Sequence, residues 1–278
     1  MGAAGNRVGL RLDHVGVAPR GYAILQSMLN VESRGSVMTL TLNRPEVRNA
    51  FNDELIAALS KSFIELPPSV RVVVIRGEGP GFCAGGDLEW MRKASSYTEE
   101  QNYEDALKLA QLFRAIVECP AVVISLVHGA AFGGGCGLVA ASDIAIARSD
   151  AKFSFSEVKL GLIPATISPF VLAKIGHGHA RALFTSGEPF DAEKALRIGL
   201  VHEIADDLNA AVNFKIKHIL MSGPSAVTAS KRLAVDDDLN LETTARRLAR
   251  ARAGDEGKEG VAAFLEKRKA SFVEEWNG

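Results

Sequence analysis

The chain has 278 residues, of which 47% are hydrophobic and 23% are charged, as is typical of one large globular domain with room for a small appendage. Its net charge of −1 and its aromatic content of 6% give no electrostatic or stacking case for binding nucleic acid or an anionic membrane. Three cysteines do not suit a disulfide scaffold, and no apolar run approaches the roughly 20 residues that span a bilayer. We therefore expect a cytoplasmic protein without membrane or nucleic-acid partners.

The first 21 residues are rich in Gly and Ala and carry three arginines. This composition weakly resembles a transit peptide, but Asp13 and the lack of an amphipathic face argue against one. We expect residues 1–21 to form a disordered extension, or to result from translation that starts at an upstream codon.

Strand and helix patterns follow in the next segment. Apolar residues alternate with threonine over residues 38–42, which predicts a half-buried strand that ends at Pro45. Asn52 suits the N-cap of a helix that stops at Pro67. The apolar stripe of this helix consists of Leu55, Leu59, Phe63 and Leu66.

Further along, buried strands are predicted at residues 70–76, 121–127 and 143–147, with a long amphipathic helix over 99–118. Strand, helix and strand at this spacing indicate right-handed βαβ crossovers. After Phe170 we expect no further strands. The predicted helices there cover residues 178–186, 191–198, 208–221, 225–235, 242–253 and 260–272. The fold class is therefore α/β followed by an all-helical region.

Two glycine-rich turns, at residues 82–87 and 131–135, each follow a predicted strand and lead into a helix start. Such turns leave backbone N–H groups unpaired and carry no side chain that blocks approach. Two of them aimed at one point form an oxyanion trap, which suits chemistry on a thioester carbonyl. The plainer interpretation is a pair of tight turns without function. A dinucleotide fingerprint fails because Leu138 stands where its third glycine belongs.

At this point the chain resembles the crotonase superfamily, also called the enoyl-CoA hydratase/isomerase family, from about Tyr22 to its C-terminus. Five signatures occur in the family's order. They are residues 42–45 with 49–50, residues 81–88, residues 128–135, residues 151–164 and residues 257–268. The resemblance implies an α/β spiral of ββα units over residues 22–205 and a C-terminal helical oligomerisation region over 206–278. It also implies a homotrimer or a dimer of trimers.

The same resemblance implies an acyl-CoA thioester substrate, with no metal and no separate cofactor because coenzyme A is part of the substrate. Carried over by position, the Gly86 and Gly134 N–H groups form the oxyanion hole and Glu157 is the acid/base residue. The predicted substrate and coenzyme A contacts are Val47, Arg48, Ala84, Asp87, Gly137, Thr166, Phe264 and Lys267. In the family, the residues at the positions of Phe264 and Lys267 often contact the coenzyme from a neighbouring subunit.

One catalytic carboxylate of the family is missing. Its two-carboxylate hydratases carry a glutamate three positions after the oxyanion glycine, and this chain has Gly137 there. A single Glu157 can activate water and return the proton on the same face of the double bond, and it also suffices for a double-bond isomerase. The alternative for Glu157 is a solvated carboxylate at a strand edge.

Residues 89–91, 133–140 and 156–169 resemble bacterial methylglutaconyl-CoA and isohexenylglutaconyl-CoA hydratases. The best prediction is therefore a 3-methylglutaconyl-CoA hydratase of leucine catabolism. The alternatives are a Δ3,Δ2-enoyl-CoA isomerase and another single-glutamate short-chain enoyl-CoA hydratase. Thr166 and Ser168 replace glycines of the common pattern and are predicted to bind a distal carboxylate or to orient water. Alternatively, Ser168 simply caps a helix.

Three other classes fit less well. Thioester hydrolysis by Cys83 or Cys136 lacks a residue pattern that fixes His128 as a partner. RNA binding lacks a basic stripe, because Lys61 is the only lysine in the helix after Asn52. Metal catalysis lacks a ligand set around the two neighbouring histidines near residue 178.

Overall fold

The computed structural model describes residues 28–236 and 238–278, so the predicted extension over residues 1–21 lies outside the described part. A six-stranded sheet forms the centre, in the order β1-β2-β3-β4-β6-β9. Its strands are β1 (Leu29–Arg34), β2 (Val37–Leu42), β3 (Val72–Gly77), β4 (Val122–Val127), β6 (Ile144–Ala147) and β9 (Glu203–Ile204). A smaller sheet joins β5 (Ala130–Phe132), β7 (Lys152–Ser154) and β8 (Phe190–Asp191).

The four strands that the sequence predicts pair in parallel, β2 with β3, β3 with β4 and β4 with β6. The expected βαβ arrangement is thereby confirmed. β1 was not predicted, and it pairs antiparallel with β2 at the edge of the sheet. Only Leu29 of β1 is buried, so this strand lacks the alternation that reveals a half-buried strand.

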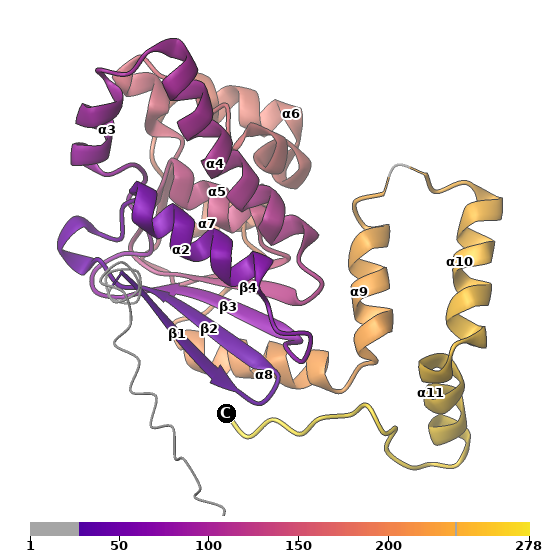
Figure 1. Ribbon diagram of the computed structural model, residues 1–278. Helices are drawn as coiled ribbons and strands as arrows, with labels where there is room; N and C mark the ends of the chain where they lie inside the picture. Colours follow the sequence, from indigo (N-terminus) through magenta and orange to yellow (C-terminus); the bar gives the residue numbers. More distant parts are fainter. Residues whose placement is uncertain (1–27, 237) are drawn as a thin grey trace, which may run out of the picture.

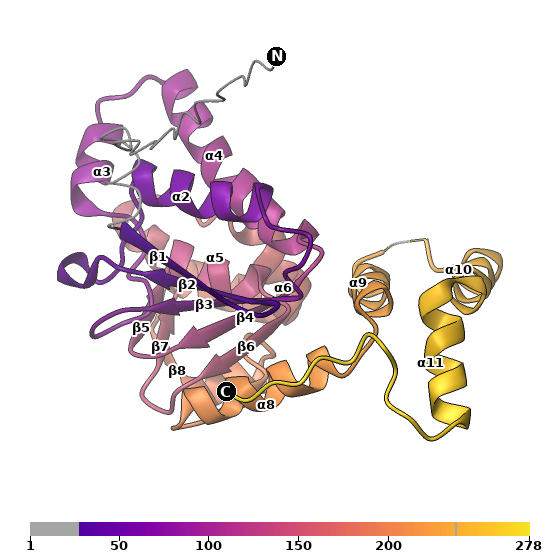
Figure 2. The same cartoon turned by 60° about the horizontal axis from the view of Figure 1, so that its bottom comes forward.

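Helices cover both faces of the main sheet (Figures 1 and 2). α2 (Asp53–Ile64), α4 (Glu99–Glu118), α5 (Gly134–Ala141) and α6 (Ser168–Ser186) belong to one side, and α8 (Leu208–Leu220) covers the other. Side chains of β3 alternate accordingly: Val73 and Ile75 join the first core, and Val72 and Val74 join the second. A strand that is buried on both faces has a continuous run of apolar residues in its sequence, as β3 does.

Helix starts are fixed by capping side chains. Asn52 Oδ1 accepts a hydrogen bond from Leu55 N at 2.9 Å, as its N-cap prediction requires. Thr98 and Gln101 form a reciprocal capping box at the start of α4, which spans the predicted 99–118. Local sequence signals were therefore sufficient for these two helices.

The structure corrects three expectations in the second half of the chain. Strands do not stop after Phe170, because β8 and β9 follow; at two residues each they are too short to show a period. α6 begins at Ser168 and runs through a kink at Gly176, where φ is 72°. α11 covers Asp255–Leu265, not 260–272, because it ends before the left-handed Lys267 (φ 55°).

Two short helices are α3 (Leu88–Ala94), which buries no residue, and α7 (Ala192–Arg197), which buries Ala192 and Ala195. Beyond α8, a helical arm made of α9 (Pro224–Leu233), α10 (Leu241–Ala253) and α11 leads away from the sheets (Figure 1). The chain then returns to the core, where Glu274 N donates to Leu220 O at 3.0 Å and Trp276 Nε1 donates to Asn213 Oδ1 at 2.9 Å. Both ends of the arm are thus attached to the core. Among the described helices, none is long and apolar enough to cross a membrane.

Candidate active site

The two glycine-rich turns meet at one point. Gly85 (φ 95°) and Gly133 (φ 49°) both adopt the left-handed conformation that favours glycine. A Cβ at Gly133 would lie 3.9 Å from Gly85 Cα, and one at Gly85 would lie 3.0 Å from Phe132 O. A side chain at either position would therefore fill the space between the turns.

Each turn presents one backbone N–H without a partner. Phe51 bonds to the residues on either side of Gly86, through Phe51 N to Gly85 O at 2.7 Å and Asp87 N to Phe51 O at 2.9 Å. Gly134 opens α5, where the first N–H groups have no partner within the helix. In the described part of the chain, neither the Gly86 N–H nor the Gly134 N–H donates a hydrogen bond. Two such donors, with the α5 dipole behind one of them, suit a developing oxyanion.

Glu157 lies against this site, on the short helix η2 (Ser156–Leu160). A Cβ at Gly133 would lie 3.1 Å from Glu157 Oε1, one residue away from the Gly134 N–H. Glu157 Oε2 is buried and has no hydrogen-bond partner among the described residues. Burial raises the pKa of this carboxyl group. The site thus holds a buried carboxylate next to the turn that carries the Gly134 N–H, and a carboxylate in such a place can accept a proton.

The position of the missing carboxylate is filled by apolar side chains. A Cβ at Gly137 would lie 2.5 Å from Ile167 Cγ2 and 2.6 Å from Phe113 Cζ. Phe113 is fully buried, and Ile167 is 1% exposed. No space is left at residue 137 for a second carboxylate, so Gly137 contributes close packing and no functional group.

The two hydroxyls predicted near the acyl group differ in their surroundings. Ser168 Oγ donates to Ala165 O at 2.8 Å. Ser168 is the first residue of α6 and Ile167 is its N-cap, so the alternative that Ser168 caps the helix is wrong. Thr166 is half-buried, and in the described residues its hydroxyl has no partner. Of the two, Thr166 is the one with a hydroxyl free for a ligand.

A cavity of about 890 Å³ adjoins the first glycine turn. Its lining includes five predicted contact or oxyanion residues, which are Val47, Arg48, Ala84, Gly86 and Asp87. Trp90 and Met91 of α3 also line it, and Trp90 packs against Gly86. Gly134, Gly137, Glu157 and Thr166 are outside this lining, so Gly86 is the one oxyanion-hole glycine among the described residues that line the cavity.

Asp87 and Arg44 hold the first turn in place. Arg44 Nη2 lies 2.8 Å from Asp87 Oδ2, while Asp87 Oδ1 accepts from Glu89 N at 2.8 Å and caps α3. Burial alone would raise the pKa of Asp87, but the hydrogen bonds from Arg44 and from the α3 backbone lower it overall. Both carboxylate oxygens are thus engaged within the protein.

Arg44 and Asn49 also build the site, although no role was predicted for either residue. Asn49 is fully buried, and its Nδ2 donates to Glu78 O at 2.8 Å and to Gly81 O at 2.9 Å. Both residues belong to the first family signature, so the signal was present. Their contacts are with segments distant in sequence, and only the folded structure reveals them.

Replacing Arg44 with Met is expected to destabilise the protein by about 3 kcal/mol, because it leaves the Asp87 carboxylate buried and unpaired. A lowered folded pKa stabilises the protein above the unfolded pKa, and this contribution is lost as the pH falls through the folded pKa. The wild type should therefore lose more stability on acidification than the variant does. Urea unfolding at neutral and acidic pH measures both effects.

The matched control is Arg92→Met, which removes an exposed arginine paired with Glu89 at 2.7 Å. Exposed ion pairs contribute about 0–1 kcal/mol. Equal losses of stability in the two variants would contradict a structural role for Arg44.

The arm residues predicted to contact coenzyme A do not reach the cavity within one chain. Phe264 is 82% exposed on α11, and Lys267 is exposed just beyond it. The arm lies on the far side of the core from α3 (Figures 1 and 2). Neither residue lines the 890 Å³ cavity.

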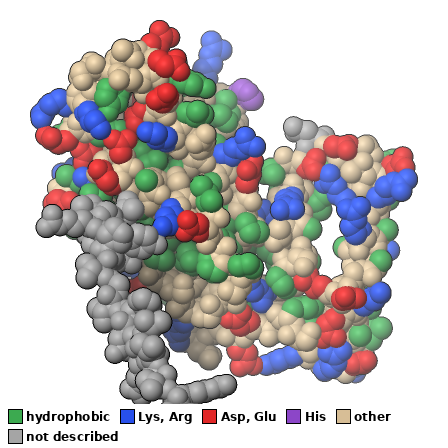
Figure 3. Space-filling view, viewed as in Figure 1, with side chains coloured by type: hydrophobic (Ala, Val, Ile, Leu, Met, Phe, Trp, Pro, Cys, Tyr) green, Lys and Arg blue, Asp and Glu red, His purple; other side chains and the backbone are tan. Residues whose placement is uncertain are grey.

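The structure does not support the rival chemistries. Burial raises the pKa of Cys83 to about 12 and also raises that of Cys136, so neither thiol is an ionised nucleophile at neutral pH. Among the described residues, no three His, Cys, Asp or Glu side chains are placed to hold a metal ion. Acidic and basic side chains are interspersed over the face seen in Figure 3, which shows no continuous basic surface.

Comparisons with known proteins agree with this geometry. The family model described as "Enoyl-CoA hydratase/isomerase" matches residues 32–275. A crotonyl-CoA hydratase from Syntrophomonas wolfei is 33% identical over an alignment that covers 87% of this chain and 96% of the relative. A 1,2-epoxyphenylacetyl-CoA isomerase from Escherichia coli is 34% identical over 85% of this chain and 95% of its own length. The solved structure of an enoyl-CoA hydratase from Shewanella pealeana superposes with a TM-score of 0.86 at 38% identity, covering 91% of this chain and 100% of that one.

Proposed function

Because the chain belongs to the enoyl-CoA hydratase/isomerase family of the crotonase superfamily and is an enzyme of the enoyl-CoA hydratase class, we propose that it hydrates a 2-enoyl-CoA with Glu157 as its single acid/base residue. The observation that carries this proposal is the placement of the Glu157 carboxylate beside the turn that carries the Gly134 N–H, together with the apolar filling at Gly137.

The Gly86 and Gly134 N–H groups hold the thioester oxygen as negative charge develops on it. Loss of one such donor typically costs about 2.7–4 kcal/mol of barrier. Glu157 removes a proton from water, the resulting hydroxide adds to the β-carbon, and the same carboxyl returns the proton to the α-carbon of the enolate. Glu157 takes up one proton and releases the same proton, so the proposed reaction requires neither a metal nor a separate cofactor.

The proposed substrate is 3-methylglutaconyl-CoA, an intermediate of leucine catabolism. Support comes from the resemblance of residues 89–91, 133–140 and 156–169 to that branch, and from the unpartnered hydroxyl of Thr166. The test is kcat/KM of the purified protein for 3-methylglutaconyl-CoA and for crotonyl-CoA. A clear preference for the first supports the proposal, and equal or better use of crotonyl-CoA contradicts the substrate while leaving the hydratase reaction in place.

Replacing Thr166 with Val is expected to raise KM for 3-methylglutaconyl-CoA about tenfold more than KM for crotonyl-CoA, because only the first substrate has a distal carboxylate for the hydroxyl. The matched control is Ser168→Ala, since Ser168 already bonds to Ala165. Equal changes in KM for both substrates would show that Thr166 does not bind the distal group.

A second candidate is Δ3,Δ2-enoyl-CoA isomerisation. It is favoured by the single carboxylate, since one base is enough to move a proton between two carbons of the acyl chain. Conversion of a 3-enoyl-CoA to the conjugated 2-enoyl-CoA without gain of water would identify this activity.

The coenzyme is proposed to lie along Val47 and Arg48 at the cavity mouth, where Arg48 can pair with a phosphate. Phe264 and Lys267 are proposed to reach it from a neighbouring copy in a trimer or a dimer of trimers, because within one chain they are far from the cavity. A cytoplasmic location stays a prediction.

A further inference from the structure

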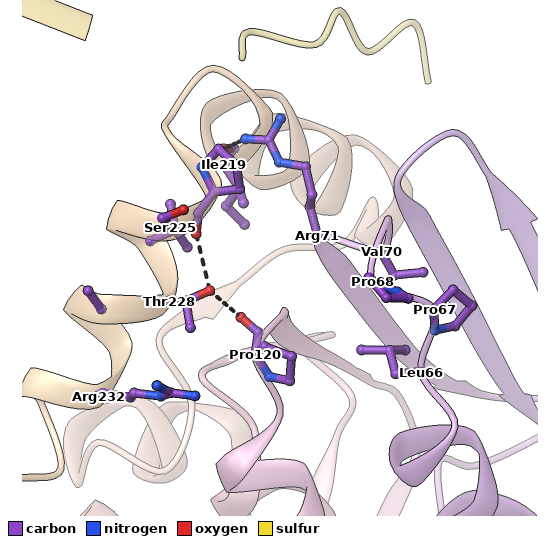
Figure 4. A pocket seen from close by; sticks show the side chains of 13 residues that line it. Leu66, Pro67, Pro68, Val70, Arg71, Pro120, Ile219, Ser225, Thr228 and Arg232 are labelled. Carbon is purple, nitrogen blue, oxygen red and sulfur yellow. Dashed lines mark hydrogen bonds between the residues drawn. The ribbon is translucent and has the colours of Figure 1, made fainter. Parts of the chain in front are cut away.

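A second cavity, of about 410 Å³, lies between the core and the first helix of the arm. Its core wall comes from the segment after α2 and from residues just before β3 and β4, and its other wall comes from the end of α8 and from the length of α9. Figure 4 shows Leu66, Pro67 and Pro68 on one side and Thr228 and Arg232 on the other. It shares no lining residue with the 890 Å³ cavity.

The walls of this cavity are held in place. Thr228 Oγ1 donates to Pro120 O at 2.9 Å, and Lys231, the residue before Arg232, pairs with Asp143 Oδ2 at 2.7 Å. Arg71 donates through Nη1 to Phe272 O at 2.9 Å. Four prolines among the lining residues further limit backbone movement. A ligand would therefore meet a preformed site, which lowers the entropic cost of binding.

The lining combines an apolar wall with two arginines, Arg71 and Arg232. Its apolar part is formed by prolines together with Leu66, Val70, Ile219, Val227 and Ala229. Within the described residues that line it, none is acidic. The start of α9 offers no anion site, because Glu256 already accepts from Ser225 N at 2.9 Å and Ala226 N at 2.8 Å.

Arg232 is the group that gives this cavity its chemical preference. In Figure 4 its side chain extends from α9 toward Pro120. No hydrogen bond or ion pair of its guanidinium occurs within residues 28–236 and 238–278. The neighbouring cation, Arg71, is held by backbone carbonyls and by Glu274 at 4.0 Å. Arg232 is thus free to form a bidentate pair with one carboxylate.

We propose that this cavity is a second ligand site, which binds a medium-chain aliphatic carboxylate with its carboxylate on Arg232 and its chain along Leu66, Val70 and Ile219. The volume is near the lower end of the range of about 300–1,000 Å³ for small-molecule pockets. A coenzyme A ester does not suit it, since the several phosphate charges of the coenzyme would face one free arginine. A ligand here contacts both the core and α9.

The test is isothermal titration of the full chain with sodium octanoate, beside octan-1-ol as the neutral analogue. Saturable binding of octanoate is expected, with at least tenfold weaker binding of octan-1-ol. Arg232→Gln should weaken octanoate binding at least tenfold, whereas the matched control Arg250→Gln, an exposed arginine of α10 outside the lining, should not change it. Octanoate should also raise the melting temperature of the wild type and of Arg250→Gln more than that of Arg232→Gln.

A second variant separates the aliphatic part of the site from its charge. Ala229 is an exposed lining residue of α9, so Ala229→Leu fills the cavity without disturbing the core. It should abolish octanoate binding while hydration of 2-enoyl-CoA continues. Absence of saturable binding to the wild type, or equal binding to the wild type and to both cavity variants, would overturn the proposal.

Discussion

Replacing Glu157 with Gln is expected to lower kcat about a thousandfold and to leave KM nearly unchanged. A carboxamide keeps the shape of the side chain but accepts no proton from water, and general acid–base catalysis typically contributes about 10²–10⁴-fold. No second carboxylate substitutes, because Phe113 and Ile167 fill the space at Gly137. The Gly86 and Gly134 N–H groups remain, so binding of the thioester is retained. Steady-state kinetics with a 2-enoyl-CoA measures the effect.

The pH dependence of the wild type gives an independent check. Glu157 must be ionised to activate water, and burial raises its pKa, so hydration should decline on acidification at a pH above the usual range for a glutamate. A raised folded pKa contributes stability that is complete below the unfolded pKa and is lost as the pH rises through the folded pKa. At neutral pH the Gln variant should therefore unfold at the same or a higher temperature than the wild type. A folded variant that keeps most of the wild-type kcat would contradict the role of Glu157.

Introducing the missing carboxylate by Gly137→Glu is expected to destabilise the protein by more than about 3 kcal/mol, or to prevent folding. A Cβ alone would approach Ile167 Cγ2 to 2.5 Å and Phe113 Cζ to 2.6 Å. Overpacking of a filled core costs about 1–3 kcal/mol, and burial of an unpaired carboxylate adds to that cost. The variant should not gain hydratase activity. Thermal and urea unfolding measure the loss.

The matched control is Gly178→Glu on α6, where an added Cβ meets no atom within 4 Å. Gly178 is exposed, and Glu has a better helix propensity than Gly. The stability of the Gly178→Glu variant should therefore stay within about 1 kcal/mol of that of the wild type. If Gly137→Glu were as stable as this control and hydrated faster than the wild type, the packing argument at residue 137 would be wrong.

Much of the fold followed from local signals. The strands β2, β3, β4 and β6 and the helices α2 and α4 were predicted because alternation, helical stripes and N-caps such as Asn52 act over a few residues. The three-residue strand β5 was not predicted. Strand β1 was not predicted because five of its six residues are exposed. Strands β8 and β9 were not predicted because each is two residues long. The kink at Gly176 joins two helical segments that local pattern separates.

The residues of the site could be predicted from the sequence, but the contacts between them could not. Glycine turns after buried strands indicated free N–H groups, and the resemblance to a family directed attention to Glu157. The absence of a glutamate at residue 137 was evident from sequence, but its cause was not, since Phe113 and Ile167 come from elements distant along the chain. The same holds for Arg44 with Asp87, a contact between residues 43 positions apart.

The most direct test of a single-glutamate hydratase is to mix the purified protein with crotonyl-CoA and 3-methylglutaconyl-CoA separately, and to follow both the absorbance of the conjugated thioester and the mass of the product. Loss of absorbance with the gain of one water, abolished in Glu157→Gln, is the predicted result. No gain of water with either thioester, together with conversion of a 3-enoyl-CoA to its conjugated isomer at unchanged mass, would contradict it.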